Sequence, residues 1–159
     1  MIKKLGIILY LIGVTITVNA QSDCEKDYQI YRNNYKQKNY EEALVSWRKV
    51  FNECPSYNQN TFANGPKLYH ERIKKDKENQ LIYLDTLMMI HDARIEYFER
   101  REYVLGKKGI DLLKYNPTRF AEAYEMLKVS VDALGNSTDP TVIVSYFKAL
   151  DDVQRSSEE

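Results

Sequence analysis

The chain has 159 residues, and its 23 basic and 23 acidic side chains give a formal net charge of zero. That balance excludes the strongly charged surface on which binding to nucleic acid or to anionic lipid depends. The length suits one domain with its own hydrophobic core. Tyrosine occurs 13 times, and its ring, which joins apolar area to one polar tip, suits half-buried surfaces and interfaces.

Residues 1–20 carry the pattern of a cleavable secretory signal peptide. Two lysines precede an apolar run from Leu5 to Val18, and Val18-Asn19-Ala20 offers small residues for cleavage before Gln21. A membrane anchor is the alternative, but the run is shorter than the roughly 20 apolar residues that a spanning helix needs. We therefore expect an exported protein, periplasmic or associated with the outer membrane, without an integral membrane span after cleavage. Removal of the two lysines leaves 21 basic and 23 acidic side chains.

Cys24 and Cys54 are the two cysteines of the chain. In an exported protein an even pair favours a disulfide, and the helices described next bring both residues to the same end of one hairpin. Such a bridge closes a loop of about 30 residues, worth roughly 3–4 kcal/mol in the chain-entropy model. Two buried free thiols are the alternative. Together with His70 and His91 the cysteines show no metal-ligand spacing, so no metal is expected.

The first two predicted helices form one hairpin. Residues 24–37 carry tyrosines at helical spacing, and residues 40–54 carry a single apolar stripe. Lys38-Asn39 makes a short turn between them, and Pro55 ends the second helix. Two amphipathic helices joined by about two residues fold back as an antiparallel pair. The apolar stripe consists of Ala43, Leu44, Trp47, Val50 and Phe51.

Five more helices are expected along the rest of the chain, which gives about seven in all and no strand. The first passes through Leu68 and Ile73, with Gly65-Pro66 near its first turn, and a charged loop follows it. Gly106 and Gly109 weaken helix formation, so only a short helix ending near Tyr115 is expected there. Each of the last two helices starts with a polar residue before a proline. The other helices are expected over residues 80–98, residues 118–134 and from residue 140 onward.

The second helix carries a recognisable motif. The stretch Asn39-Tyr40-Glu41-Glu42-Ala43-Leu44, followed by Trp47, Val50 and Pro55, resembles the second half of a tetratricopeptide repeat. That motif places a small residue where two helices approach closely, an aromatic residue four positions later, and a closing proline. The match departs in the first helix, where Tyr31 occupies the usual small position and Lys38 replaces the turn glycine.

The chain as a whole resembles exported tetratricopeptide-like proteins of Bacteroidetes bacteria. The resemblance rests on the Ala-Gln end of the signal, on Cys54-Pro55, and on residues 83–88, 94–98 and 105–109. It implies an all-α fold of stacked antiparallel helix hairpins, a TPR-like α-solenoid, over residues 21–155. The last predicted helix keeps an apolar face, whereas solenoid ends normally carry a polar cap. We therefore expect that the chain is the N-terminal part of a longer protein, or that this helix docks onto another surface.

Sequence motifs for catalysis are lacking. The chain contains no His-Glu-x-x-His, no glycine-rich phosphate loop and no Cys-x-x-Cys. His91 lies in the apolar stripe of its helix, which indicates a core or interface histidine, and His70 is expected at the surface. Asp92, Arg94 and Glu96 are expected to form helix salt bridges and not to carry out acid–base chemistry. We expect neither an enzyme nor a bound cofactor.

Non-enzymatic binding of another envelope or exported protein or peptide is therefore the function expected from the sequence. Exposed aromatic residues favour interfaces, so the candidate partner-binding residues are tyrosines of the inner helices, namely Tyr28, Tyr31, Tyr35 and Tyr69. Packing inside the hairpins is the alternative interpretation of the same tyrosines. A small-ligand or glycan-binding exported protein is the alternative function.

Overall fold

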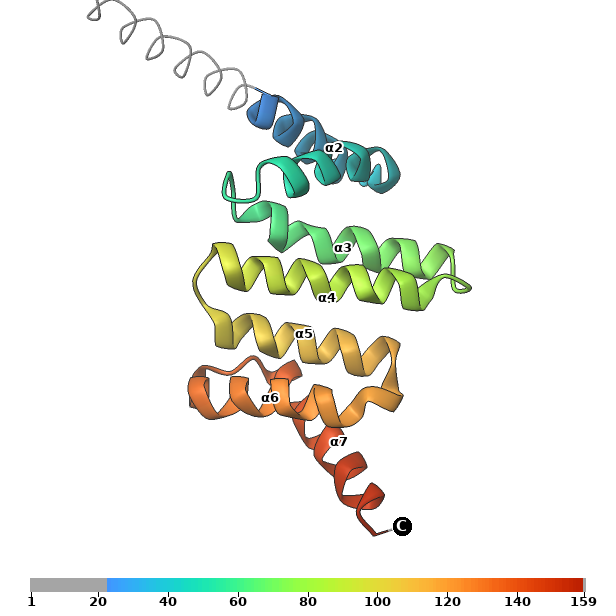
Figure 1. Cartoon of the computed structure of the whole chain (residues 1–159), viewed down its shortest axis with the longest axis vertical. Coiled ribbons are helices and arrows are strands. Elements are labelled where there is room, and N and C mark those ends of the chain that lie inside the picture. The colour runs from blue at the N-terminus through green and yellow to red at the C-terminus, as the bar shows by residue number, and fades with distance from the viewer. Residues whose placement is uncertain (1–22, 159) are drawn as a thin grey trace, which may run out of the picture. The chain divides into compact units, whose positions relative to one another are not determined.

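The computed structural model describes residues 23–158 of the chain (Figure 1). The predicted signal peptide lies outside the described residues. Over residues 23–158 the chain forms seven α-helices and two single-turn 3-10 helices without a β-strand, which confirms the predicted all-α fold and its number of helices. In chain order the elements are residues 23–36, α2 (Tyr40–Glu53), α3 (Asn60–Lys75), α4 (Gln80–Tyr97), α5 (Arg101–Tyr115), η1 (Pro117–Arg119), α6 (Phe120–Leu134), η2 (Gly135–Ser137) and α7 (Pro140–Ser156).

The chain divides into two compact units, with the boundary between Thr61 and Phe62. Unit 1 is described from residue 23 to Thr61 and contains the first hairpin. Unit 2 begins at Phe62 and contains the helices from α3 onward, apart from the first two residues of α3. Within residues 23–158, none of the helices combines the length and the apolar character that crossing a bilayer requires.

The hairpin of unit 1 has the two helices and the short turn that the sequence predicts. In the turn Lys38 has a φ of 63°, a left-handed conformation that favours glycine. A disulfide joins Cys24 to Cys54, whose Cα atoms are 5.9 Å apart. The predicted bridge is therefore confirmed, and it ties the start of the first helix to the end of α2.

Trp47 lies at the centre of the core of unit 1. Its ring is fully buried and stacks on Phe51, with the ring centroids 4.9 Å apart. The indole Nε1–H donates a hydrogen bond of 2.7 Å to the carbonyl of Thr61, which satisfies the polar edge of a buried ring. Ala43 and Val50 are also fully buried, so the predicted apolar stripe of α2 forms part of the core.

Unit 2 is organised around α5. This helix packs against α4, α6 and α7, and Figure 1 shows α4, α5 and α6 running side by side. Helices α3 and α4 form a hairpin whose connection is fixed by one tyrosine. The Tyr83 hydroxyl donates to Asp76 at 2.7 Å and accepts from Arg72 at 3.2 Å. Leu84 of α4 and Leu112 of α5 are both buried in the core of this unit.

The start of α3 differs from the sequence prediction. The helix begins at Asn60, so Pro66 lies inside it and not in its first turn. Proline lacks a backbone N–H, and the helix therefore forgoes one i→i−4 hydrogen bond. Phe62, Leu68 and Ile73 are fully buried on the apolar side of α3, and their burial offsets that loss.

The short helix expected before Tyr115 is instead a continuous helix of 15 residues, α5, that contains Gly106 and Gly109. Each glycine meets a neighbouring helix at a distance that leaves no room for a side chain. A Cβ on Gly106 would lie 2.6 Å from Ser130 Oγ, and a Cβ on Gly109 would lie 2.7 Å from Leu127 Cγ. Glycine costs a helix roughly 1 kcal/mol, but the close approach of α5 and α6 that it permits buries apolar side chains, so tertiary packing overrides local propensity.

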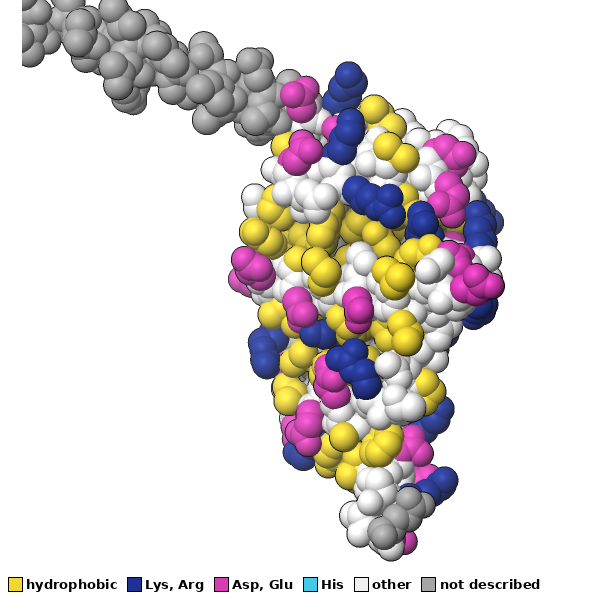
Figure 2. Space-filling view, turned by 45° about the vertical axis from the view of Figure 1, so that its right-hand side comes forward, with side chains coloured by type: hydrophobic (Ala, Val, Ile, Leu, Met, Phe, Trp, Pro, Cys, Tyr) yellow, Lys and Arg dark blue, Asp and Glu magenta, His cyan; other side chains and the backbone are white. Residues whose placement is uncertain are grey.

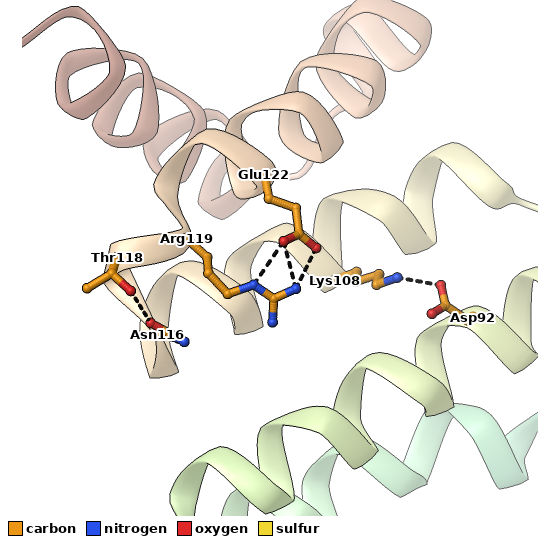
Figure 3. A network of polar contacts seen from close by, with 6 residues as sticks. All are labelled: Asp92, Lys108, Asn116, Thr118, Arg119 and Glu122. Atoms are coloured by element: carbon orange, nitrogen blue, oxygen red, sulfur yellow. Dashed lines mark hydrogen bonds and ion pairs between the residues drawn. The ribbon is translucent and has the colours of Figure 1, made fainter. Parts of the chain in front are cut away.

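Helices α6 and α7, each predicted to start with a polar residue before a proline, begin in different ways. Asp139 accepts a hydrogen bond of 2.8 Å from the backbone N–H of Thr141, which is the cap predicted for α7. Asn116 makes no such bond, because Pro117–Arg119 form a 3-10 turn before α6. The Asn116 side chain instead accepts a hydrogen bond of 2.6 Å from the Thr118 hydroxyl (Figure 3).

Candidate functional site

The four tyrosines predicted to bind a partner do not form an exposed aromatic surface. Tyr31 is fully buried, and Tyr28 and Tyr69 are buried as well. Tyr28 and Tyr31 meet edge to face, with ring centroids 5.1 Å apart. Tyr35 is half-buried and lies against the ring of Tyr40, at 5.8 Å. Three of the four tyrosine rings are thus buried, and packing inside the helical units accounts for them.

Two histidines and one aspartate join three helices of unit 2. Asp111 of α5 lies between His70 of α3, whose Nε2 is 2.8 Å from Oδ1, and His91 of α4, whose Nε2 is 2.9 Å from Oδ2. A carboxylate only accepts hydrogen bonds, so each imidazole donates its Nε2–H. His91 is buried, as predicted. His70 keeps 26% of its side chain exposed, and it is bonded within the unit.

The charge of Asp111 follows from this arrangement. Burial raises the pKa of the Asp111 carboxyl, but the hydrogen bonds from His70 and His91 outweigh it and bring the pKa down to about 2. Asp111 is therefore ionised at neutral pH. A buried carboxylate that lacked such donors would be strongly destabilising. The two histidines thus stabilise the anion, and the anion fixes the orientation of both rings.

A cavity of about 380 Å³ opens beside these three residues. Its walls come from α3, α4, α5 and the first turn of α7. Besides the histidines and Asp111, basic and aromatic side chains line it, among them Arg94, Tyr103, Lys107 and Lys114. Sites of this size hold small molecules, and a few polar groups on their walls set the orientation of the ligand.

Arg94 and Tyr103 form one wall of the cavity. The Arg94 guanidinium lies over the Tyr103 ring, 5.7 Å from its centroid. The Arg94 Nε is buried and has no hydrogen-bond partner within residues 23–158. Burial lowers the pKa of Arg94 from its ordinary value, an effect that the neighbouring Tyr103 opposes. This guanidinium keeps its positive charge, and its Nε lacks an acceptor within the part of the chain that the structure describes.

Lys107, unlike Arg94, has a carboxylate partner. Its Nζ lies 2.6 Å from Asp139 Oδ2, and Asp139 is also the cap of α7. The Lys107 ammonium, followed by the hydroxyl and backbone N–H of Thr141, holds the pKa of Asp139 far below its usual range. Lys107 therefore connects α5 to α7 at the rim of the cavity.

The arrangement offers few of the parts that nucleophilic catalysis needs. Both imidazole Nε2–H groups are engaged by one carboxylate. The two cysteines of the chain form the disulfide of unit 1, so they supply no thiol. Among the described residues no group of three His, Cys, Asp or Glu side chains is placed to hold a metal ion. What the cavity presents is a set of fixed hydrogen-bond donors and cations.

One signal in the sequence points to this site. Asp111 falls seven residues after the buried Val104, so it occupies the apolar side of α5, where a carboxylate needs a partner. Its partners come from helices 41 and 20 residues earlier. No local spacing reveals such pairs. The cavity follows from how three helices pack, which single-helix patterns do not specify.

The outer face of α4 is a second candidate surface. Ile82 and Met89 are 64% and 61% exposed, and they are seven residues apart, so they project on the same side of the helix. Leu81 beside them is also exposed. The opposite side of α4 is buried through Leu84 and Leu87. On α7, Val144 and Phe147 are exposed as well, in keeping with the apolar face expected on the last helix.

Several charged side chains on the surface form ion pairs. Asp92 on α4 pairs with Lys108 on α5, and Arg119 donates to Glu122 at 2.7 and 2.9 Å (Figure 3). The salt bridge expected along α4 thus joins two helices. On the face seen in Figure 2 acidic and basic side chains are interspersed, with hydrophobic side chains between them. That face has no extended area of one charge sign.

Comparison with known proteins identifies no relative of this chain. No protein-family model, no curated protein and no solved structure matches the chain.

Proposed function

We propose that this chain is a non-enzymatic protein–protein interaction module of the bacterial cell envelope, built on tetratricopeptide-like helix hairpins. The observation that carries the proposal is the second apolar side of α4. Ile82 and Met89 lie exposed in one line, opposite the buried Leu84 and Leu87. The helix thus carries apolar side chains on two opposite sides, and the side that faces away from the core is suited to a partner.

Single exposed apolar residues are common and need no explanation. The face of α4 is different, because Leu81, Ile82 and Met89 together expose apolar area on one helix, with the exposed Asp85 between them. A partner helix or extended peptide with complementary apolar residues would cover it. The disulfide Cys24–Cys54 supports an oxidising compartment, and another envelope or exported protein is the partner that this compartment provides.

Site-specific photo-cross-linking tests the proposal. A photoreactive amino acid is placed at position 89 of the full chain in its native host, with position 125 on α6, an exposed glutamate, as the matched control. We expect a discrete adduct of higher mass from position 89 and none from position 125. The adduct should disappear when Ile82→Lys is added. Absence of any adduct from positions 82 and 89, with the chain monomeric, would contradict the proposed interaction.

The cavity favours a second candidate, a small-ligand or glycan-binding exported protein. The volume of about 380 Å³ and the fixed donors on its walls are the supporting observations. Thermal unfolding of the full chain against a panel of oligosaccharides and small acids separates this function from the first. A ligand that binds the folded chain stabilises it by an amount that grows with the logarithm of the ligand concentration over Kd, and so raises the melting temperature, whereas an interaction module without a ligand site shows no shift.

A further inference from the structure

We propose that the cavity beside Arg94 binds a small organic monoanion through a carboxylate group. The inference rests on the ligand-binding candidate, for which it names a ligand class, and does not use the outer face of α4. Its starting point is that the cavity is a built site. Three helices and the first turn of α7 converge on it, and Asp111 with its two histidines fixes their relative positions.

The charges on the walls favour an anion. Arg94, Lys107 and Lys114 are the lining cations, and Asp111 is the lining carboxylate. Asp139 neutralises Lys107 from outside the lining. Three lysine and arginine cations against two aspartate carboxylates leave one positive charge without a counterion. A monoanion balances that charge, whereas a phosphate dianion would exceed it.

Arg94 is the group that such an anion would meet. Its Nε is buried without an acceptor in the described part of the chain, and the face of its guanidinium rests on Tyr103. An unpaired donor of this kind costs free energy that a correctly placed acceptor returns. Guanidinium and carboxylate are both planar and form two parallel hydrogen bonds, so a carboxylate is the complementary group.

Lys114 supplies a second cation at the rim. The side chain is exposed, and its ammonium lies 4.8 Å from the centroid of the Tyr115 ring. No carboxylate pairs with it among residues 23–158. A long exposed lysine attracts an anion without fixing its orientation, so we expect a smaller contribution from Lys114 than from Arg94.

The remaining walls suit an organic body attached to the carboxylate. Ala63 and Pro66 of α3 and Ile110 of α5 contribute apolar surface, and Tyr103 contributes a ring. Apolar walls around one charged anchor are the usual composition of a small-molecule site. Inorganic anions would use the anchor and leave these walls in contact with water. The proposed ligand class is therefore a small aromatic or aliphatic monocarboxylic acid.

Benzoate and benzamide form the matched pair of probes, because they have the same ring and nearly the same shape but differ in charge. Binding is followed by amide chemical shifts of the isotopically labelled full chain. We expect benzoate to shift amides around Arg94, Tyr103 and Asp111 and to saturate in the millimolar range. Benzamide and inorganic phosphate should shift them weakly or not at all. Equal responses to benzoate and benzamide, or no response to either, would overturn the proposal.

Substitution then locates the anchor. Arg94→Gln should weaken benzoate binding by about tenfold or more, because a charge-assisted bidentate contact is lost. Arg119→Gln, which removes a half-buried arginine outside the cavity, should leave it unchanged. The circular dichroism of both variants reports whether they fold. Should Arg94→Gln not fold, Lys114→Gln at the exposed rim is the substitute, with a reduction of several-fold expected. Unchanged binding in the folded variant would overturn the assignment.

The same titrations separate this inference from the function on which it rests. A neutral oligosaccharide that shifts the cavity amides while benzoate does not would keep the cavity as a ligand site and refute the anion. If neither moves these amides, both the anion and the ligand-binding candidate fail. The cross-linking result at position 89 is independent of both outcomes, since it probes the opposite, exposed side of α4.

Discussion

Replacing Gly109 by alanine tests the packing of α5 most directly, because two explanations of this helix predict opposite signs. If the glycine merely weakens a local helix, alanine should stabilise the protein by roughly 1 kcal/mol. The structure predicts destabilisation. A Cβ at position 109 would lie 2.7 Å from Leu127 Cγ and 3.2 Å from the Ala123 carbonyl oxygen. Leu127 is fully buried, and a backbone carbonyl cannot move aside without moving α6.

The magnitude follows from these two opposing effects. Forcing an extra carbon into a packed core costs typically 1–3 kcal/mol, and the gain in helix propensity recovers roughly 1 kcal/mol. We therefore expect a net loss of about 1–2 kcal/mol. Urea titration followed by far-ultraviolet circular dichroism measures it, with Glu125→Ala on the exposed side of α6 as a control that should stay within about 0.5 kcal/mol.

A double substitution shows whether Leu127 is the cause. Leu127→Ala alone should cost about 2–5 kcal/mol, because it leaves a cavity in the core. In that background the methyl group added by Gly109→Ala occupies the space that the Leu127 side chain vacated. The stability loss of the double variant should therefore be at least about 1 kcal/mol smaller than the sum of the two single losses. Stabilisation by Gly109→Ala alone, or strict additivity of the pair, would refute the close approach of α5 and α6.

Three further predictions concern the disulfide, the buried indole and the buried carboxylate. Replacing both Cys24 and Cys54 by serine should lower the free energy of unfolding by roughly 3–4 kcal/mol, followed by fluorescence of Trp47, the sole tryptophan; an unchanged urea midpoint would contradict this. Trp47→Phe should cost about 1–3 kcal/mol by circular dichroism, because the Thr61 carbonyl loses its donor, and a loss below 0.5 kcal/mol (about the noise of such comparisons) would mean that water replaces the indole. Asp111 has a pKa of about 2 in the folded chain against 3.8 ordinarily, so its contribution is complete above pH 3.8 and is lost as the pH falls toward 2. The stability difference between wild type and Asp111→Asn should thus shrink by about 2 kcal/mol over that interval, and a difference independent of pH would exclude an ionised Asp111.

The sequence predicts most of the helices because their signals are local. The turn at Lys38, the stripe through Trp47 and the cap at Asp139 each depend on residues within a few positions, and the structure has all three. The Cys24–Cys54 bridge was predictable for a related reason. Once two helices form a hairpin, the ends of that hairpin are brought together whatever else the chain does.

Features that depend on contacts between distant helices escape such reasoning. Gly106 and Gly109 lower helix propensity when α5 is considered alone, and only α6 explains why they occur inside a helix. His70 has an unremarkable sequence neighbourhood, yet its partner Asp111 lies 41 positions away. The burial of the tyrosines is also not predictable from local sequence, for a different reason. Tyrosine suits interfaces and interiors equally, and its position in the packed unit decides which applies.

The position of the disulfide has a consequence for the order of events during biosynthesis. Both cysteines lie within the first 54 residues, and every residue that packs around Trp47 in unit 1 precedes Phe62. A chain that enters an oxidising compartment from its N-terminus therefore presents the complete loop before α4 and the later helices arrive. The first hairpin can be covalently closed while the cavity of unit 2 does not yet exist, so early oxidation leaves no cysteine to pair wrongly as the rest of the chain folds.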